Sequence, residues 1–273
     1  MKTGVLNYLL IVSIVCIAAS CTTPRYAYSP AAQNVPVFIK KGDSKLGAYY
    51  STNSLGGEQP NGSITNNRSR GFDLNGAFAI TDHFAVQTNY FYRWEKTTVG
   101  ADSIILRYKR NLTEVGLGYF LPANNKGNVY FQFFAGIGLG RFSFTDVDKI
   151  AVNFHQANVT KIYLQPAVIF GSKSSFTTSL SIRASILSYS KIKTSYNPSQ
   201  LKTYKLDSLN KGTRIFFEPA VVARYRFKKF PGVSLEVQGG IALPASRQFV
   251  DYRFLNFSIG TSVDIGSFFR KEK

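Results

Sequence analysis

The chain has 273 residues, with 33 Lys and Arg against 15 Asp and Glu, so its formal net charge is +18 at pH 7. Only two cysteines are present, which excludes a fold held together by several disulfides. In a cytosolic protein this positive charge would favour nucleic-acid binding, but the leader described next indicates export and argues against a nucleic acid as partner.

Residues 1–20 have the features of a secretory signal peptide. Lys2 precedes an apolar run from Leu9 to Ala19, and small residues lead to Cys21. The run is too short to span a bilayer, which takes about 20 residues in a helix. Removal of this leader leaves about 250 residues, enough for one barrel or two soluble domains.

The sequence Ala18-Ala19-Ser20-Cys21 resembles a lipobox, in which small residues precede a cysteine that becomes the lipidated N-terminus. Because Cys16 lies in the leader, Cys21 is the one cysteine of the expected mature chain, and lipid attachment explains it. Cleavage without lipid is the alternative. No acidic run of the kind that sends some lipoproteins to the outer face follows Cys21, since the first acidic residue is Asp43. The anchor is therefore expected in the periplasmic leaflet.

Residues 21–43 are predicted to form a periplasmic tether between the lipid and the folded domain. Pro24, Pro30 and Pro36 interrupt the segment, and no periodic stretch in it is long enough to pack.

After the tether, ten segments alternate between apolar and small or polar residues, which is the pattern of β-strands. They cover residues 45–51, 72–80, 84–95, 103–120, 129–140, 162–170, 179–186, 215–227, 233–243 and 252–269. Short turns at 81–83, 122–128, 172–175 and 228–232 alternate with generally longer loops at 53–70, 97–102, 146–153, 193–212 and 245–251. Pro166 lacks a backbone donor, so we expect a bulge there.

The last segment, residues 252–269, shows the pattern most clearly. One face carries Leu255, Phe257, Ile259, Thr261, Val263 and Ile265, and the other carries Asn256, Ser258, Gly260, Ser262, Asp264 and Gly266. A tilted strand needs about 9–11 residues to cross a bilayer, so this segment is long enough. It resembles the closing strand of Gram-negative outer-membrane β-barrels.

The sequence therefore predicts an all-β fold: an antiparallel, up-and-down transmembrane β-barrel over residues 44–269, followed by a basic tail at 270–273. About ten strands are expected, with eight as the fallback, joined by short periplasmic turns and longer external loops. A soluble barrel or sandwich is the alternative, because alternation alone does not say which face is outside. The strand lengths, the scarcity of Lys on the polar face and the aromatic residues at strand ends favour the membrane arrangement.

The pattern over residues 44–269 resembles small outer-membrane barrel proteins of the OmpA-transmembrane and OmpW-like kind, with a lipoprotein leader in front. This resemblance implies an outer-membrane location in a Gram-negative bacterium. The chain departs from those families in its ten strands, its acyl anchor and its basic tail, and no functional residue carries over from them.

Charged residues of both signs fall on the polar, inward face. They are Asp73, Arg93, Glu95, Glu114, Arg183, Glu218, Arg224, Arg226, Glu236 and Asp264. In a narrow lumen such groups are expected to pair, because an unpaired buried charge is costly. Two interpretations stay open: a salt-bridged plug that fills the barrel, and a polar path for a small solute.

No catalytic, metal or cofactor motif is found. His83 lies in a short turn, and His155 follows a loop with Asp146 and Asp148, so an Asp/His general base is conceivable. The acidic pair and His/Asp pair of the ten-stranded outer-membrane proteases are not matched here. An enzyme is therefore the remote alternative.

Basic residues gather around the loop at 193–212 and its neighbour: Lys191, Lys193, Lys202, Lys205, Lys211 and Arg247. Outer-membrane lipid and the phosphates of lipopolysaccharide are the expected partners, and a merely solvated loop is the alternative. The sequence thus predicts a non-enzymatic outer-membrane lipoprotein with a structural role or a role in binding other envelope proteins. A narrow pore is the second hypothesis.

Overall fold

The computed structural model describes residues 25–54, 68–99, 104–147, 151–230, 232–246 and 250–266. The predicted leader, Cys21 and the predicted tail at 270–273 lie outside the described residues. The strands are β1 (Ser44–Ser54), β2 (Ser69–Ala79), β3 (Phe84–Val99), β4 (Ile104–Pro122), β5 (Val129–Val147), β6 (Val152–Phe170), β7 (Phe176–Thr194), β8 (Arg214–Arg226), β9 (Val233–Ile241), β10 (Leu243–Pro244) and β11 (Leu255–Val263). A short helix, α2 (Pro198–Thr203), lies in the loop between β7 and β8.

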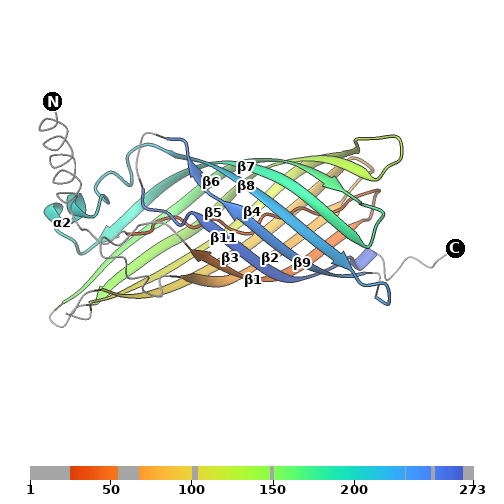
Figure 1. Cartoon of the computed structure of the whole chain (residues 1–273). Helices are drawn as coiled ribbons and strands as arrows, with labels where there is room; N and C mark the ends of the chain where they lie inside the picture. Colours follow the sequence, from red (N-terminus) through yellow and green to blue (C-terminus); the bar gives the residue numbers. More distant parts are fainter. Residues whose placement is uncertain are drawn as a thin grey trace, which may run out of the picture.

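The strands form one closed antiparallel wall (Figure 1). Each strand from β1 to β8 pairs with the next, β11 pairs with β1 and β9, and β9 pairs with β8. β10 also pairs with β8, so β9 and β10 are two parts of one wall strand interrupted at Ala242. The barrel therefore has ten wall strands, which confirms the expected fold class and the larger strand count.

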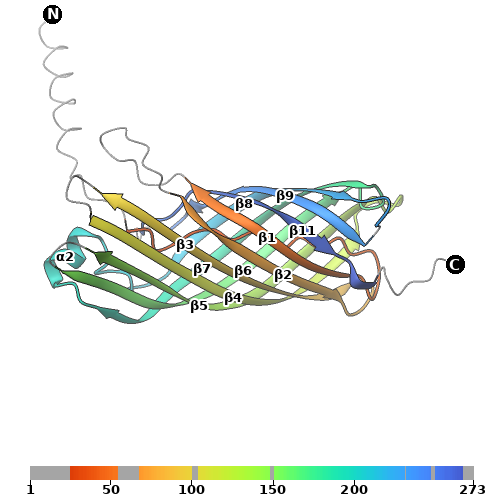
Figure 2. The same ribbon diagram turned by 90° about the horizontal axis from the view of Figure 1, so that it is seen from below.

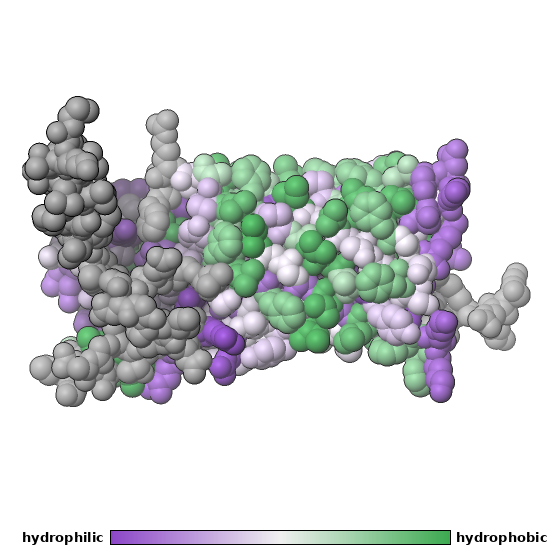
Figure 3. All heavy atoms as spheres, viewed as in Figure 1, coloured by the Kyte–Doolittle hydropathy of each residue, from purple (hydrophilic) through white to green (hydrophobic). Residues whose placement is uncertain are grey.

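The wall presents apolar side chains outwards and polar ones inwards. On β2, Phe72, Leu74 and Phe78 are exposed, whereas the alternating Asp73 and Asn75 are buried. Figure 3 shows a broad apolar band across the face of the wall in view, with hydrophilic side chains gathered at the end that carries the short turns. A continuous apolar surface of this size is unusual for a soluble monomer and is the normal outer face of a membrane barrel.

In the part of four strands that lies nearest the longer loops, the apolar residues face the inside of the barrel instead of the outside. On β4, Val115 and Leu117 point outwards, but further up Leu112 and Tyr108 are buried inside. β5 to β7 change in the same way at neighbouring register positions, and the buried residues there form an apolar cluster with Phe142, Phe144, Val159, Leu187 and Tyr189. The change of face indicates where the strands leave the bilayer and enter water.

Strand length supports this interpretation. β4, β5, β6 and β7 have 19 residues each. At about 3.3 Å per residue and a tilt of about 40°, such a strand rises roughly 48 Å, about twice the height of a 25 Å apolar band. The loop end of the barrel therefore projects well beyond the membrane, with its own apolar interior.

The expectation of a tether over residues 21–43 is wrong for its described part. Residues 25–38 run through the inside of the barrel from the loop end to the short-turn end, as the red trace in Figure 1 shows and Figure 2 shows from below. Ala27, Ala32, Asn34, Val35 and Phe38 are at most 3% exposed. We call residues 25–38 the lumen segment.

The expected bulge at Pro166 is also wrong. Pro166 lies opposite Phe133 in an unshifted ladder between β5 and β6. The ladder from β6 to β7 keeps the same register on both sides of Pro166, and its one register shift falls between Gln156 and Asn158. The missing donor of the proline therefore removes pairing locally without inserting an extra residue.

Candidate functional site

The inside of the barrel holds the candidate site, because the polar side chains of the wall and the lumen segment meet there. Its lowest ion cluster centres on Glu236 of β9. One carboxylate oxygen accepts from Arg224 Nε at 2.8 Å, and the other accepts from Lys45 Nζ at 3.0 Å and from the Tyr49 hydroxyl at 2.8 Å. Glu236 is 2% exposed, so three donors on β8 and β1 compensate the cost of burying its charge.

A second cluster lies higher on β2 and β3. Arg93 donates from Nη2 to Asp73 at 2.7 Å and from Nε to the Asn53 side chain at 2.9 Å. The hydroxyl of Ser51 also contacts Asp73. Both charged groups are almost fully buried, so the pair fixes the inner face of the first three strands.

A third cluster crosses the lumen from β4 to β8. Lys161 lies 3.2 Å from Glu114 and 3.6 Å from Glu218, and Arg183 lies 3.3 Å from Glu114. The Tyr28 hydroxyl of the lumen segment donates to Glu218 at 2.7 Å. The cluster therefore joins opposite parts of the wall through the segment inside it.

The uppermost cluster centres on Glu95. It pairs with Arg110 at 3.4 Å and with Arg253, both buried. Arg110 also donates to the backbone oxygen of Tyr26 at 2.7 and 3.0 Å, and the guanidinium of Arg253 stacks on the Tyr26 ring at 3.8 Å.

The lumen segment is held by the wall along its whole length. Near Tyr28 its backbone pairs with residues 251–253, since the Ala27 N–H donates to the Asp251 oxygen and the Arg253 N–H to the Tyr28 oxygen, both at 2.9 Å. Buried backbone groups need partners, and further along the segment wall side chains supply several of them. The contacts, in order down the lumen, are the Arg25 side chain to Asp146 at 3.0 Å, Asn53 to the Pro30 oxygen at 2.9 Å, the Gln33 N–H to Gln238 at 2.9 Å, Asn34 to the Gly76 oxygen at 2.9 Å and Arg224 to the Val35 oxygen at 2.8 Å.

Of the ten residues predicted to line the lumen, eight are buried inside and ion-paired: Asp73, Arg93, Glu95, Glu114, Arg183, Glu218, Arg224 and Glu236. Arg226 and Asp264 lie instead at the short-turn mouth, partly exposed, and Asp264 accepts from the Ser44 hydroxyl at 3.0 Å. With Lys45 and Arg224 they border a cavity of about 210 Å³ at this mouth.

The sequence reasoning missed several partners of these charges, namely Lys45, Arg110, Lys161 and Arg253. The alternation could have identified two of them. Lys45 is an even number of residues from the inward-facing Tyr49 and Ser51, and Arg110 is an even number of residues from the inward-facing Glu114. Nothing in the alternation pointed to Arg25, because it belongs to the lumen segment, which does not alternate, whereas its partner Asp146 lies near the end of β5.

No family model and no curated protein matches this chain. Among solved structures, the translocator domain of the autotransporter NalP from Neisseria meningitidis is similar with a TM-score of 0.51 and 8% identity, covering 82% of this chain and 89% of that chain. The fold is that of an outer-membrane β-barrel. Two further solved structures are similar with lower TM-scores: the outer-membrane protease OmpT from Escherichia coli (TM-score 0.43, 12% identity, covering 82% of this chain and 95% of that chain) and an outer-membrane channel from Pseudomonas putida F1 (TM-score 0.41, 9% identity, covering 85% and 99%).

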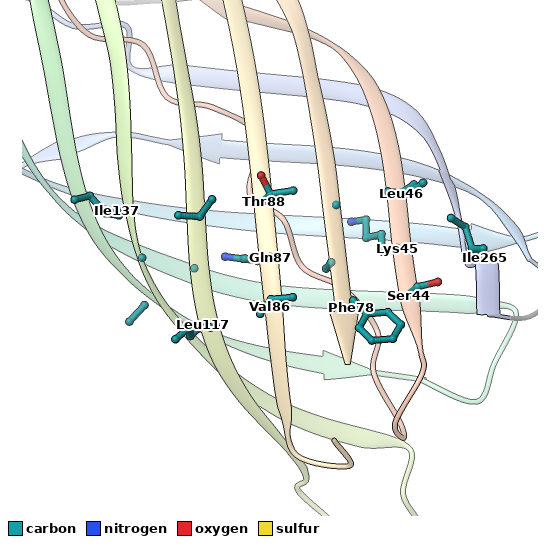
Figure 4. A pocket seen from close by; sticks show the side chains of 16 residues that line it. Ser44, Lys45, Leu46, Phe78, Val86, Gln87, Thr88, Leu117, Ile137 and Ile265 are labelled. Atoms are coloured by element: carbon teal, nitrogen blue, oxygen red, sulfur yellow. The ribbon is translucent and has the colours of Figure 1, made fainter. Parts of the chain in front are cut away.

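The outer-membrane barrel also has a shallow groove of about 940 Å³ on its outer wall (Figure 4). Leu46, Phe78, Val86, Leu117 and Ile137 border it and belong to the apolar band. The groove lies over Gly76, Gly116 and Gly136, whose missing side chains thin the wall there. It is therefore part of the apolar outer surface, and its lining residues offer no cluster of reactive groups.

Neither histidine of the outer-membrane barrel is placed as a general base. His155 is fully buried between Phe142 and Phe144, and its two ring nitrogens have no hydrogen-bond partner among the described residues. Asp146 is engaged by Arg25 and by the Tyr196 hydroxyl at 3.1 Å, and Asp148 lies outside the described residues. His83 lies in the turn before β3, against the oxygen of Phe120.

The described part of the chain contains no group of three His, Cys, Asp or Glu placed to hold a metal ion, and no helix long and apolar enough to cross a bilayer.

The predicted basic residues lie at the loop end and are exposed: Lys191, Lys193, Lys202, Lys205 and Lys211. Arg247 lies outside the described residues. Helix α2 in this loop begins with a capping box between Asn197 and Gln200, which keeps the loop ordered. Beside it, burial raises the pKa of the Asp251 carboxyl, opposed by the hydrogen bond from the Arg25 backbone N–H.

Proposed function

We propose that the protein is a lipid-anchored barrel of the Gram-negative outer membrane with a structural or partner-binding role, neither an enzyme nor an open pore. The observation that carries this proposal is the lumen segment. It occupies the barrel from the Arg25–Asp146 pair at the loop end to Phe38, which packs on Phe120 at the short-turn end.

Physical cost argues against routine opening of the lumen. Removal of the segment would leave the carboxylate of Glu218 without Tyr28 and the guanidinium groups of Arg110 and Arg224 without their backbone acceptors. Each buried group left without a partner costs about 1–3 kcal/mol, and more when it is charged. Several such losses together favour a permanently filled barrel of the small OmpA-like and OmpW-like kind over a channel.

The lipid anchor is part of the proposal. Removal of residues 1–20 would follow transfer of a diacylglyceryl group from a phospholipid to Cys21. The Sγ–carbon bond forms as the bond to the phospholipid headgroup breaks, and the thiol proton goes to the departing headgroup.

Outer-membrane lipid and lipopolysaccharide are the proposed partners of the exposed lysines at the loop end, through charge-assisted hydrogen bonds to phosphate. Other envelope proteins are further candidates, and no nucleic acid or cofactor enters the proposal.

Bilayer recording and fractionation together test the proposal. The tagged protein is expected in the outer-membrane fraction, with a gel mobility that shifts on boiling, and the purified barrel is expected to give silent planar bilayers. Steady ion conductance, altered by Glu236→Gln or Arg224→Gln, would instead support a narrow pore. The cavity at the short-turn mouth is the observation that favours this second candidate.

A further inference from the structure

We propose that the chain leaves the barrel on the outer surface of the cell, so that the acyl group on Cys21 anchors in the outer leaflet. This inference rests on the proposed lipoprotein function and reverses the expectation of an anchor in the periplasmic leaflet. It concerns which side of the membrane carries the modified N-terminus, and it follows from the direction of the lumen segment.

The two ends of the barrel differ in their connections. The connections after β2, β4, β6 and β8 are short, and they share an end with the start of β1 and the end of β11. The other end carries the long β7–β8 connection with α2 and the extended tips of β4 to β7. Short turns face the periplasm in bacterial outer-membrane barrels and longer loops face outwards, so the end with α2 is external.

The contacts of the lumen segment fix its direction. Its first residue, Arg25, is bound at the external end by Asp146 and Asp251, and its guanidinium stacks on Tyr204 just after α2, 4.1 Å from the ring centre. At the opposite end the N–H of Lys41 donates to Asp82, in the short turn between β2 and β3, at 2.8 Å. The chain therefore enters the lumen from outside and reaches β1 at the periplasmic end.

Chain length then decides on which side Cys21 lies. Four residue steps separate Cys21 from Arg25, and a fully extended chain spans at most about 3.6 Å per step, or roughly 14 Å. The lumen segment itself uses 14 residues to pass through the barrel, which is about 45 Å when extended. The chain from Arg25 is thus too short for Cys21 to return to the periplasmic leaflet, which leaves the external side of the barrel for the anchor.

The surroundings of the exit fit this placement. Tyr204, on which Arg25 stacks, lies between the exposed Lys202 and Lys205 of the basic loop. A lipid inserted next to this exit would share its leaflet with the anionic headgroups that the loop is proposed to bind. Anchor and basic loop would then lie on the same, external side of the barrel.

Thiol labelling of intact cells tests the orientation. Thr23→Cys places a thiol next to the exit, Thr203→Cys places one on α2 as an external control, and Asn125→Cys places one in the short turn after β4 as a periplasmic control. A maleimide too large and polar to cross the outer membrane is added before or after permeabilisation. Wild type gives the background, because an acylated Cys21 carries no free thiol, and incorporation of labelled fatty acid that is lost in Cys21→Ala establishes the acylation.

The expected result is labelling of Thr23→Cys and Thr203→Cys in intact cells and of Asn125→Cys only after permeabilisation. Labelling of Thr23→Cys only after permeabilisation, with both controls as expected, overturns the inference while the barrel stands. Controls that do not differ from each other, or the absence of fatty acid in wild type, overturn the proposed function itself. As a second readout, a protease site inserted after Thr23 is expected to be cut by protease added to intact cells, and protection of a folded, heat-modifiable barrel from this cut contradicts the inference.

Discussion

The ammonium nitrogen of Lys45, on the first wall strand, lies 3.0 Å from the carboxylate of Glu236 on β9, although β11 separates these two strands in the wall. Arg224 of β8 reaches the second oxygen of the same carboxylate. One acidic side chain thus ties together three strands around the point where the barrel closes.

Glu236→Gln is expected to lower the free energy of unfolding by about 3–5 kcal/mol, because it leaves two buried cations without a charged partner. Urea titration of the barrel in detergent micelles, read by heat-modifiable gel mobility, measures the effect. Asp207→Asn, at an exposed position in the β7–β8 loop, is the matched control and should leave the midpoint unchanged. An equal midpoint for Glu236→Gln and wild type would show that the cluster adds nothing to stability.

Deletion of residues 25–38 is expected to turn the silent barrel into an ion-conducting one. The wall keeps its strand pairing, while the space now filled by the lumen segment opens to water. Planar-bilayer recording compares this variant with a deletion of residues 198–203, which removes α2 outside the lumen and should stay silent. Silent recordings from a correctly folded 25–38 deletion would mean that wall side chains alone close the barrel.

Two strand glycines should respond differently to a methyl group. A Cβ at Gly140 would overlap the backbone oxygen of Asn111 on the neighbouring strand, whereas a Cβ at Gly239 meets nothing within 4 Å. Gly140→Ala is therefore expected to destabilise the barrel by about 1–3 kcal/mol, as overpacking does, and Gly239→Ala to be close to neutral. Equal unfolding midpoints for the two variants would contradict this account.

Trp94, the one tryptophan of the chain, is expected to lie at the membrane–water interface on the external side. It points outwards, is 42% exposed and packs on Tyr92 with ring centres 5.8 Å apart. β3 begins at Phe84 near the short-turn end, and ten residues at a tilt of about 40° rise roughly 25 Å, the height of the apolar band. Quenchers attached near the lipid headgroup should reduce the fluorescence of Trp94 more than quenchers at the bilayer centre. The reverse order would contradict this placement of the apolar band relative to β3.

Asp251 gives a prediction about pH. Because burial raises the pKa of its carboxyl above the usual value of 3.8, the folded protein binds this proton more tightly than the unfolded chain. Its contribution to stability is therefore present at low pH and lost as the pH rises through the raised pKa. Asp251→Asn should remove that part of the pH dependence when unfolding is measured from pH 4 upwards. If the free energies of unfolding of wild type and Asp251→Asn differ by the same amount at every pH in this range, the effect is excluded.

Alternation in the sequence was enough to predict the ten wall strands, because each strand separates lipid from a polar interior at every second residue. It misplaced strand ends where that rule stops. β6 was expected to begin at residue 162 but begins at Val152, since above the membrane its inward residues Ala157 and Val159 are the apolar ones. In such a strand the apolar residues face outwards within the membrane and inwards above it. A search for one alternating pattern along the whole strand therefore finds neither part clearly.

The lumen segment was missed for a different reason. A wall strand has an inside and an outside, and so its sequence alternates, but the lumen segment is surrounded by protein on every side. Tyr28 reaches Glu218, Asn34 reaches Gly76 and the Val35 oxygen meets Arg224, so polar and apolar residues follow one another without a period. Its prolines, which suggested an unpacked tether, suit a chain whose backbone pairs with a neighbouring stretch near Tyr28 but is otherwise bound mainly by side chains.

The pairing of β1 with β11 also sets the order in which the molecule can be assembled. The strand that closes the wall, β11, follows all the other wall strands along the chain, so the cylinder stays open along one side until β11 has been made and exported. Once that side shuts, residues 25–38 would have to be drawn lengthwise through an interior packed with side chains. Residues 25–38 must therefore already lie against the inner surface when β1 and β11 meet, so the wall closes around the segment that precedes it in the chain.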